Sequence, residues 1–159
     1  MGVNSEPLRA ARLLALLAPA GLLAGAYLGQ YAFGLFPCEM CWWQRYPHFA
    51  AMALALLAFL LPPRVPVALA GIAVALSGAI GGFHAGVEYG WWEGVTACTA
   101  GTFANGGDPL AAILAAPVVR CDVAPWSLFG ISLAGWNFLF SLAAALAIFI
   151  LLGRGRSRT

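Results

Sequence analysis

The chain has 159 residues, of which 62% are hydrophobic and only 9% are charged, whereas soluble domains carry roughly 25% charged residues. Together with a mean hydropathy of +0.87, this composition argues against a soluble globular domain and predicts an integral membrane protein with room for about four spans of about 20 residues. The net charge is only +2 and the basic residues are scattered, so nothing indicates nucleic-acid binding.

Four apolar stretches predict an all-α fold, an integral membrane four-helix bundle. They cover about residues 13–36, 46–61, 65–87 and 126–152. Pro62 and Pro63 interrupt the second and third stretches, so these two should form a hairpin with a tight turn. We expect one membrane domain over residues 1–159, with a loop at about 88–125 as its one long connection. Arg9 to Ala20 resembles a cleavable signal peptide, but the apolar run continues to residue 36, which favours a span.

The long loop contains a further helical signal. Asp108 is a good N-cap and Pro109 fits the first helical position. Residues 110–119 are apolar but too short to span a membrane. They predict a short helix that lies in the interfacial plane.

The arginines orient the bundle. Six of the eight basic residues fall on one side of an even-numbered topology: Arg9, Arg12, Arg64, Arg154, Arg156 and Arg158. By the positive-inside rule, this side and both termini are cytoplasmic. All four cysteines then lie on the outer side, where the oxidising bacterial periplasm lets disulfides persist.

The cysteines form two pairs. Cys38 and Cys41 make a CxxC motif just before the second apolar stretch, and Cys98 and Cys121 lie in the long loop. CxxC spacing suits reversible two-electron chemistry, here at a membrane surface. Because no period-2 strand pattern is present, the motif does not indicate a thioredoxin-like βαβ fold. Two cysteine pairs in so apolar a chain indicate thiol redox coupled to a molecule dissolved in the bilayer.

Three segments together resemble the DsbB family of membrane disulfide-forming proteins. They are CEMCWWQRYPH at 38–48, GVEYGWW at 86–92, and CDVAPWSLFGISLAGWN at 121–137. The resemblance covers nearly the whole chain. It implies a four-helix bundle in the bacterial inner membrane, bound ubiquinone or menaquinone, and a soluble periplasmic DsbA-like partner with a thioredoxin fold.

The resemblance also implies a role for each cysteine. Cys98 and Cys121 would form the loop disulfide, with Cys98 as the site of a transient mixed disulfide with the partner. Cys121 would then resolve toward the membrane pair, where Cys38 exchanges with the loop and Cys41 faces the quinone. Thiol–disulfide exchange proceeds by thiolate attack, so each sulfur must be accessible to the next.

Three other residues are candidate quinone ligands. Arg45 follows Cys41 by one turn if the segment is helical, so it could stabilise a Cys41 thiolate and polarise a quinone carbonyl. However, Pro47 fits best at a helix start, which would leave Cys41 in the preceding loop. Glu88 ends the third stretch, and Tyr89 stands where some family members have a histidine near the quinone. The simpler alternatives are an arginine that snorkels to lipid head groups and a surface carboxylate.

Two other functional classes stay open. Four cysteines could bind zinc, and His48 with His84 could ligate a haem, although the wide spacing of the second cysteine pair is unlike a zinc knuckle. Alternatively, the cysteines could be static disulfide staples in a non-enzymatic membrane protein. Metal analysis and a visible spectrum test the first class, and quinone reduction by an added dithiol tests the second.

Overall fold

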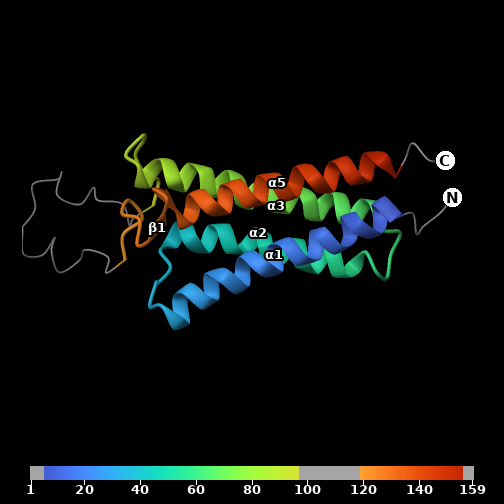
Figure 1. The fold of residues 1–159 in the computed structure, drawn as a ribbon, viewed down its shortest axis with the longest axis horizontal. Coiled ribbons are helices and arrows are strands. Elements are labelled where there is room, and N and C mark those ends of the chain that lie inside the picture. The colour runs from blue at the N-terminus through green and yellow to red at the C-terminus, as the bar shows by residue number, and fades with distance from the viewer. Residues whose placement is uncertain (1–5, 97–118, 156–159) are drawn as a thin grey trace, which may run out of the picture.

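A computed structural model of the chain describes residues 6–96 and 119–155. Four long helices run side by side along the molecule: α1 (Glu6–Ala32), α2 (Glu39–Leu57), α3 (Arg64–Glu88) and α5 (Leu133–Arg154) (Figure 1). Among the described residues, α1, α3 and α5 are long and apolar enough to cross a membrane. The helical membrane architecture expected from the sequence is therefore supported for three of the four predicted spans, and α2, which covers the predicted span at 46–61, is not among them. The interfacial helix expected at 110–119 falls almost entirely outside the described residues.

Helix α2 begins earlier than the sequence predicted. It starts at Glu39 rather than near residue 46, and Pro47 lies inside it. The expectation that Pro47 starts the helix is wrong because the sulfur of Cys38 caps the helix instead, accepting the backbone N–H of Cys41 at 3.3 Å. Arg45 and Cys41 therefore lie one helical turn apart.

The last apolar stretch divides into a hairpin and a helix. Strands β1 (Ser127–Leu128) and β2 (Ile131–Ser132) pair antiparallel, and α5 begins only at Leu133. Phe129 and Gly130 form the turn with φ of 53° and 77°, the left-handed conformation of a type I′ hairpin. Two-residue strands are too short to show a period-2 pattern, so they could not be predicted from the sequence.

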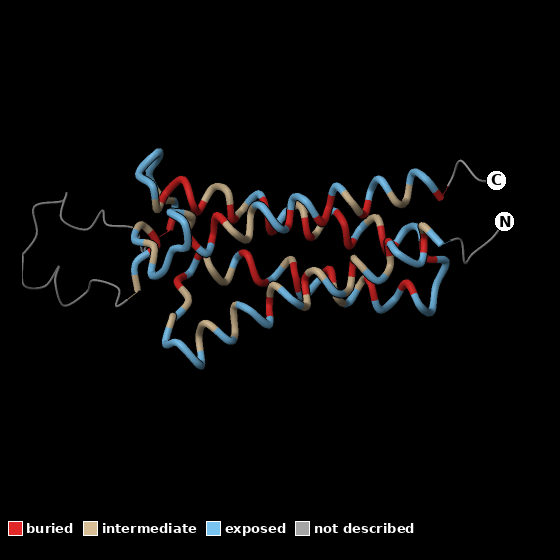
Figure 2. Tube along the Cα trace, viewed as in Figure 1, coloured by how far each residue is buried: buried red, intermediate tan, exposed pale blue. Residues whose placement is uncertain are grey.

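Small residues let the helices approach closely. A Cβ on Gly81 in α3 would lie 2.9 Å from the carbonyl oxygen of Ala134, and one on Gly78 would lie 3.0 Å from Cβ of Ser141. Close backbone approach of this kind is typical of helix packing in membranes. Buried positions face the neighbouring helices and exposed positions face outward (Figure 2).

The two ends of the bundle differ in chemistry. The start of α1, the α2–α3 turn and the end of α5 share one end, whereas the CxxC motif and the hairpin lie at the other (Figure 1). The first end carries Arg9, Arg12, Arg64 and Arg154, and Arg64 donates from Nη2 to the carbonyl oxygen of Gly155 at 2.5 Å. The fold thus separates the arginines of these helix ends from the cysteines by the length of the helices.

Candidate functional site

The CxxC motif occupies the N-terminus of α2. Cys38 is buried and Cys41 half-buried, both are free thiols, and their sulfurs lie 3.0 Å apart. The hydrogen bond between the sulfurs is the largest cause that lowers the pKa of Cys38 from 9.0 to about 4. Burial opposes this shift, and a hydrogen bond from His84 and the capping N–H of Cys41 support it. The positive end of a helix favours a thiolate in the same way. The sequence hypothesis placed the thiolate at Cys41, whereas the capping bonds of the dithiol state favour it at Cys38.

One loop cysteine packs directly against this motif. Cys121 is fully buried and disulfide-bonded, and it shares a small apolar cluster with Cys38, Met40 and Val87. The hydroxyl of Thr96 donates to its sulfur at 3.4 Å. Cys98 lies outside the described residues. The fold therefore brings Cys121 from the far end of the long loop to the first turn of α2.

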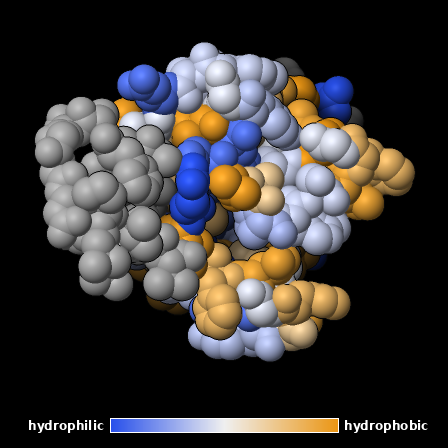
Figure 3. Space-filling view, turned by 90° about the vertical axis from the view of Figure 1, so that its left-hand side faces the viewer, coloured by the Kyte–Doolittle hydropathy of each residue, from blue (hydrophilic) through white to orange (hydrophobic). Residues whose placement is uncertain are grey.

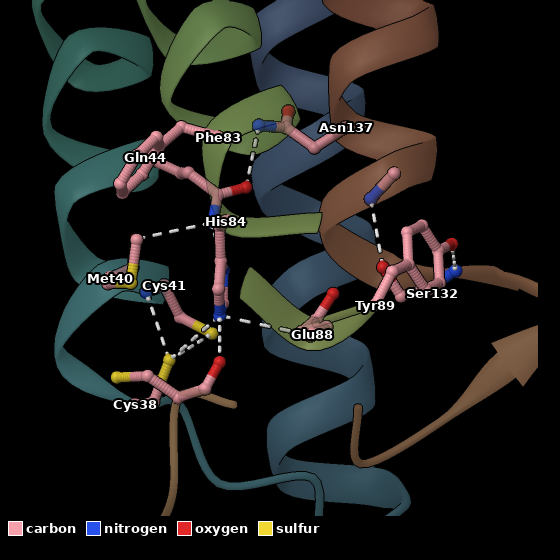
Figure 4. Close-up of polar contacts among 12 residues, drawn as sticks. Cys38, Met40, Cys41, Gln44, Phe83, His84, Glu88, Tyr89, Ser132 and Asn137 are labelled. Carbon is pink, nitrogen blue, oxygen red and sulfur yellow. Dashed lines mark hydrogen bonds and ion pairs between the residues drawn. The ribbon is translucent and has the colours of Figure 1, made fainter. Parts of the chain in front are cut away.

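His84 connects the two cysteine segments. Its Nε2 lies 3.6 Å from Sγ of Cys38, 3.1 Å from the carbonyl oxygen of Cys121 and 3.8 Å from Oε1 of Glu88 (Figure 4). Its Nδ1 lies 2.8 Å from Nε2 of Gln44, and the residue is only 1% exposed. The sequence hypothesis considered His84 only as a haem ligand. The available signal was its position one helical turn before Glu88.

Arg45 points toward α1. It is only 6% exposed, and its guanidinium donates to Oε1 of Gln30 at 2.7 Å and to the carbonyl oxygen of Ala26 at 3.4 Å. The guanidinium also lies 4.8 Å from the ring centre of Tyr27 and 4.9 Å from that of Trp42. This burial disagrees with the snorkelling alternative and instead fixes a positive charge between two helices. Gln30 was not singled out from the sequence.

A cavity of about 280 Å³ opens between α1, α2 and α5. Figure 3 looks onto the end of the molecule that carries the CxxC motif, and it shows a hollow between the lower part of the molecule and the larger part above it. The wall of the cavity is mainly apolar, and a Cβ on Gly21 or Gly25 of α1 would meet no atom within 4 Å. Its polar lining includes the side chains of Cys41, Gln44, Arg45, His48 and Asn137. Ligand pockets hold roughly 300–1,000 Å³, so this space suits a single ring with a polar edge.

Glu88 and Tyr89 do not line this cavity. The carboxylate of Glu88 is buried and faces His84. The hydroxyl of Tyr89 accepts the backbone N–H of Ser132 at 2.9 Å and donates to the carbonyl oxygen of Gly130 at 3.3 Å, which anchors the hairpin to the end of α3. Of the candidate quinone ligands, the structure therefore brings Arg45 and Cys41 to one cavity and leaves Glu88 and Tyr89 outside it.

The metal alternative can be weighed against this geometry. The donor atoms of Cys38, Cys41 and His84 lie within 4.8 Å of one another. An ion would need the lone pair of Nε2, but this nitrogen faces a carbonyl oxygen and so carries hydrogen. His48 is also engaged, with Nε2 3.0 Å from Oδ1 of Asn137 and 2.9 Å from the hydroxyl of Ser77. The arrangement suits thiol chemistry better than metal ligation.

Comparisons with known proteins agree with this chemistry. A family described as "Disulfide bond formation protein DsbB" matches residues 8–151. Similar proteins named "Disulfide bond formation protein B" include one from Verminephrobacter eiseniae, 31% identical over 96% of this chain and 90% of its own. Another, from Azoarcus sp., is 34% identical over 85% of this chain and 87% of its own. A third, from Marinobacter nauticus, is 29% identical over 89% and 90% of the two chains. No solved structure matches the chain.

Proposed function

The chain belongs to the DsbB family of disulfide bond formation proteins, and we propose that it reoxidises a periplasmic DsbA-like dithiol protein and passes the electrons to ubiquinone or menaquinone. The observation that carries this proposal is the packing of Cys121 against Cys38, beside a cavity that Cys41 lines. This packing supports a path for electrons from the loop to the bundle interior.

The proposed path is a series of thiol–disulfide exchanges. A thiolate of the partner attacks Cys98 in the Cys98–Cys121 disulfide, so that a mixed disulfide forms and the electron pair moves to Cys121. The Cys121 thiolate attacks Cys38 in the Cys38–Cys41 disulfide. A Cys38–Cys121 bond forms, the bond to Cys41 breaks, and Cys41 holds the electron pair at the wall of the cavity. The shared cluster of Cys38 and Cys121 supports the second exchange.

We place the quinone in the cavity next to Cys41 and Arg45. A bound quinone supplies an acceptor for two electrons and two protons. The guanidinium of Arg45, fixed by Gln30, provides positive charge where negative charge would develop on the ring, and the apolar wall excludes water. In this proposal Glu88 and Tyr89 do not bind the quinone. Glu88 lies beside His84, and Tyr89 anchors the hairpin through its hydroxyl.

The proposed location is the bacterial inner membrane. The arginine-bearing helix ends would face the cytoplasm together with both termini, and the cysteines would face the periplasm. Within one membrane domain of residues 1–159, this places the disulfide exchange in an oxidising compartment and the cavity within reach of a lipid-soluble quinone.

A trapping experiment tests the path. Replacing Cys121 with alanine removes the resolving thiol, so Cys98 is a free thiol that can open the disulfide of an oxidised DsbA-like protein, and the resulting mixed disulfide between Cys98 and the partner should accumulate on non-reducing gels because no Cys121 is present to displace the partner. The matched Cys98→Ala variant should form no such complex. If the complex forms with Cys98→Ala and not with Cys121→Ala, the two roles are reversed. If neither variant forms it, the cysteines are static staples and the proposal fails.

A further inference from the structure

We propose that His84 is a catalytic residue of the thiol exchange, held in the one neutral tautomer whose Nε2–H donates to the sulfur of Cys38. Gln44 and Asn137 are positioning residues that fix this tautomer. The inference deepens the proposed function and rests on its assignment of Cys38 as the sulfur that exchanges with Cys121.

The orientation of the Gln44 amide follows from a backbone carbonyl. Nε2 of Gln44 lies 3.2 Å from the carbonyl oxygen of Met40, and because a carbonyl oxygen only accepts hydrogen bonds, the amide nitrogen must face it. The same nitrogen lies 2.8 Å from Nδ1 of His84. Since an amide nitrogen only donates, Nδ1 of His84 must be the acceptor.

Asn137 on α5 fixes the same orientation independently. Its Nδ2 lies 3.2 Å from the carbonyl oxygen of Ser77, which again requires a donor at this position. This nitrogen donates to Oε1 of Gln44 at 2.9 Å. On the other side of the amide, Oδ1 accepts the hydroxyl of Ser141 at 3.0 Å. Two backbone carbonyls, on α2 and α3, therefore determine which way both amides point.

The orientation of the Gln44 amide determines which ring nitrogen of His84 carries hydrogen. A neutral imidazole has one N–H, and because Nδ1 accepts a hydrogen bond, the N–H is at Nε2. Nε2 lies 3.1 Å from the carbonyl oxygen of Cys121, which accepts. Figure 4 shows that Nε2 also faces the sulfur of Cys38 and the carboxylate of Glu88, which accept as well. His84 thus stabilises a Cys38 thiolate by donation, and it also holds the Cys121 backbone against α2.

Other titratable groups around Cys38 are few among the described residues. On α2, the sulfur of Cys41 lies 3.0 Å from the sulfur of Cys38. On α3, the carboxylate of Glu88 lies 3.8 Å from Nε2 of His84. Cys121 from the loop is disulfide-bonded and does not titrate. The guanidinium of Arg45 is bonded to α1 instead. A change at His84 should therefore act on Cys38 directly.

The hydrogen bond from His84 should accelerate the release of Cys38 from its disulfide with Cys121. Once the partner's second thiolate has attacked the partner's sulfur in the mixed disulfide, the oxidised partner leaves and Cys98 is released as a thiolate. The Cys98 thiolate then attacks Cys121 in the Cys38–Cys121 disulfide, so that the Cys98–Cys121 bond forms and the Cys38–Cys121 bond breaks. The electron pair remains on Cys38 as a thiolate, and no proton changes place. Because a thiol of lower pKa is the better leaving group, a donor fixed at Cys38 accelerates this step.

Nitrogen NMR tests the tautomer directly. The chain has two histidines, so protein labelled with ¹⁵N-histidine gives two pairs of ring signals, and the His84→Gln spectrum assigns them. In reduced, quinone-free protein at neutral pH, His84 should show a protonated Nε2 and an unprotonated Nδ1. A protonated Nδ1, alone or in an imidazolium, would overturn the inference.

Alkylation of Cys38 tests the consequence. The rate of iodoacetamide labelling, followed by mass spectrometry across pH, reports the Cys38 thiolate. His84→Phe should raise the pH of half-maximal Cys38 labelling, the midpoint, by about one unit. This shift is a tenfold loss of Cys38 thiolate at a pH below the midpoint. His84→Gln, which keeps a donor, should recover part of the shift, and Gln44→Leu should give a smaller shift in the same direction.

The matched control is Ser141→Ala, which removes a hydrogen bond at the far end of the network and leaves both carbonyl anchors. Its midpoint should equal that of the wild type. Unshifted midpoints in both His84→Phe and Gln44→Leu, with normal quinone reduction by the wild type, would refute the role of His84. Shifted midpoints with no quinone reduction by the wild type would instead refute the proposed function.

Discussion

Filling the cavity from α1 should weaken quinone binding without disturbing the thiol chemistry. A Cβ on Gly25 meets no atom within 4 Å, and Gly25 lines the cavity of about 280 Å³. Gly25→Leu should therefore be accommodated in the empty protein, and it should favour the helix, since glycine costs about 1 kcal/mol relative to alanine. With a ring in the cavity, the same leucine causes overpacking.

The magnitude follows from the cost of overpacking. Forcing extra methylenes into filled space costs about 1–3 kcal/mol, and each 1.4 kcal/mol is tenfold in affinity. In Gly25→Leu, the KM for quinone should therefore rise by about fivefold to about a hundredfold in a stopped-flow assay of quinone absorbance. The mixed disulfide that Cys121→Ala traps should form equally well when Gly25→Leu is added to that variant. Gly153→Leu is the matched control, because Gly153 also has no atom within 4 Å of its Cβ but does not line the cavity. An unchanged KM in Gly25→Leu would place the quinone elsewhere.

Three further predictions concern charge. Arg45→Ala should raise the KM for quinone by about tenfold or more, because it removes a buried charge held by Gln30, and Arg45→Lys should rescue only part because a point charge replaces a planar fork. Equal kinetics of wild type and Arg45→Ala would reduce Arg45 to a packing residue. In the reduced protein, alkylation of Cys38 should be half-maximal near pH 4, the depressed pKa, rather than near 9.0. The same shift should stabilise the reduced fold above pH 9, and this stabilisation should be lost as the pH falls toward 4. A midpoint near 9 in the alkylation profile would contradict the capping geometry.

The sequence predicted the helices and the cysteine chemistry because both depend on local patterns. Apolar stretches of membrane length and a CxxC motif can be read without knowledge of the packing. The start of α2 was missed because cysteine is not among the usual N-cap residues, and only the structure shows the sulfur of Cys38 accepting the N–H of Cys41.

The polar network could not be predicted in the same way. Gln44 and His84 are 40 residues apart in the chain, and Gln44 and Asn137 are 93 apart, so their contacts depend on how three helices pack. Likewise, Arg45 was placed beside Cys41 by its spacing of one turn, but its partners Gln30 and Ala26 come from α1. Spacing along one helix predicts which residues share a face, and it does not predict what this face meets.

The most direct test of the account is electron transfer through both cysteine pairs. Under anaerobic conditions, the purified protein is mixed with a reduced thioredoxin-fold partner and with ubiquinone or menaquinone, and the quinone absorbance is followed. The account predicts that one quinone is reduced for each partner dithiol oxidised, and that Cys38→Ser and Cys98→Ser each abolish this turnover. Quinone reduction that continues in the Cys98→Ser protein, or its absence with every quinone in the wild type, would contradict it.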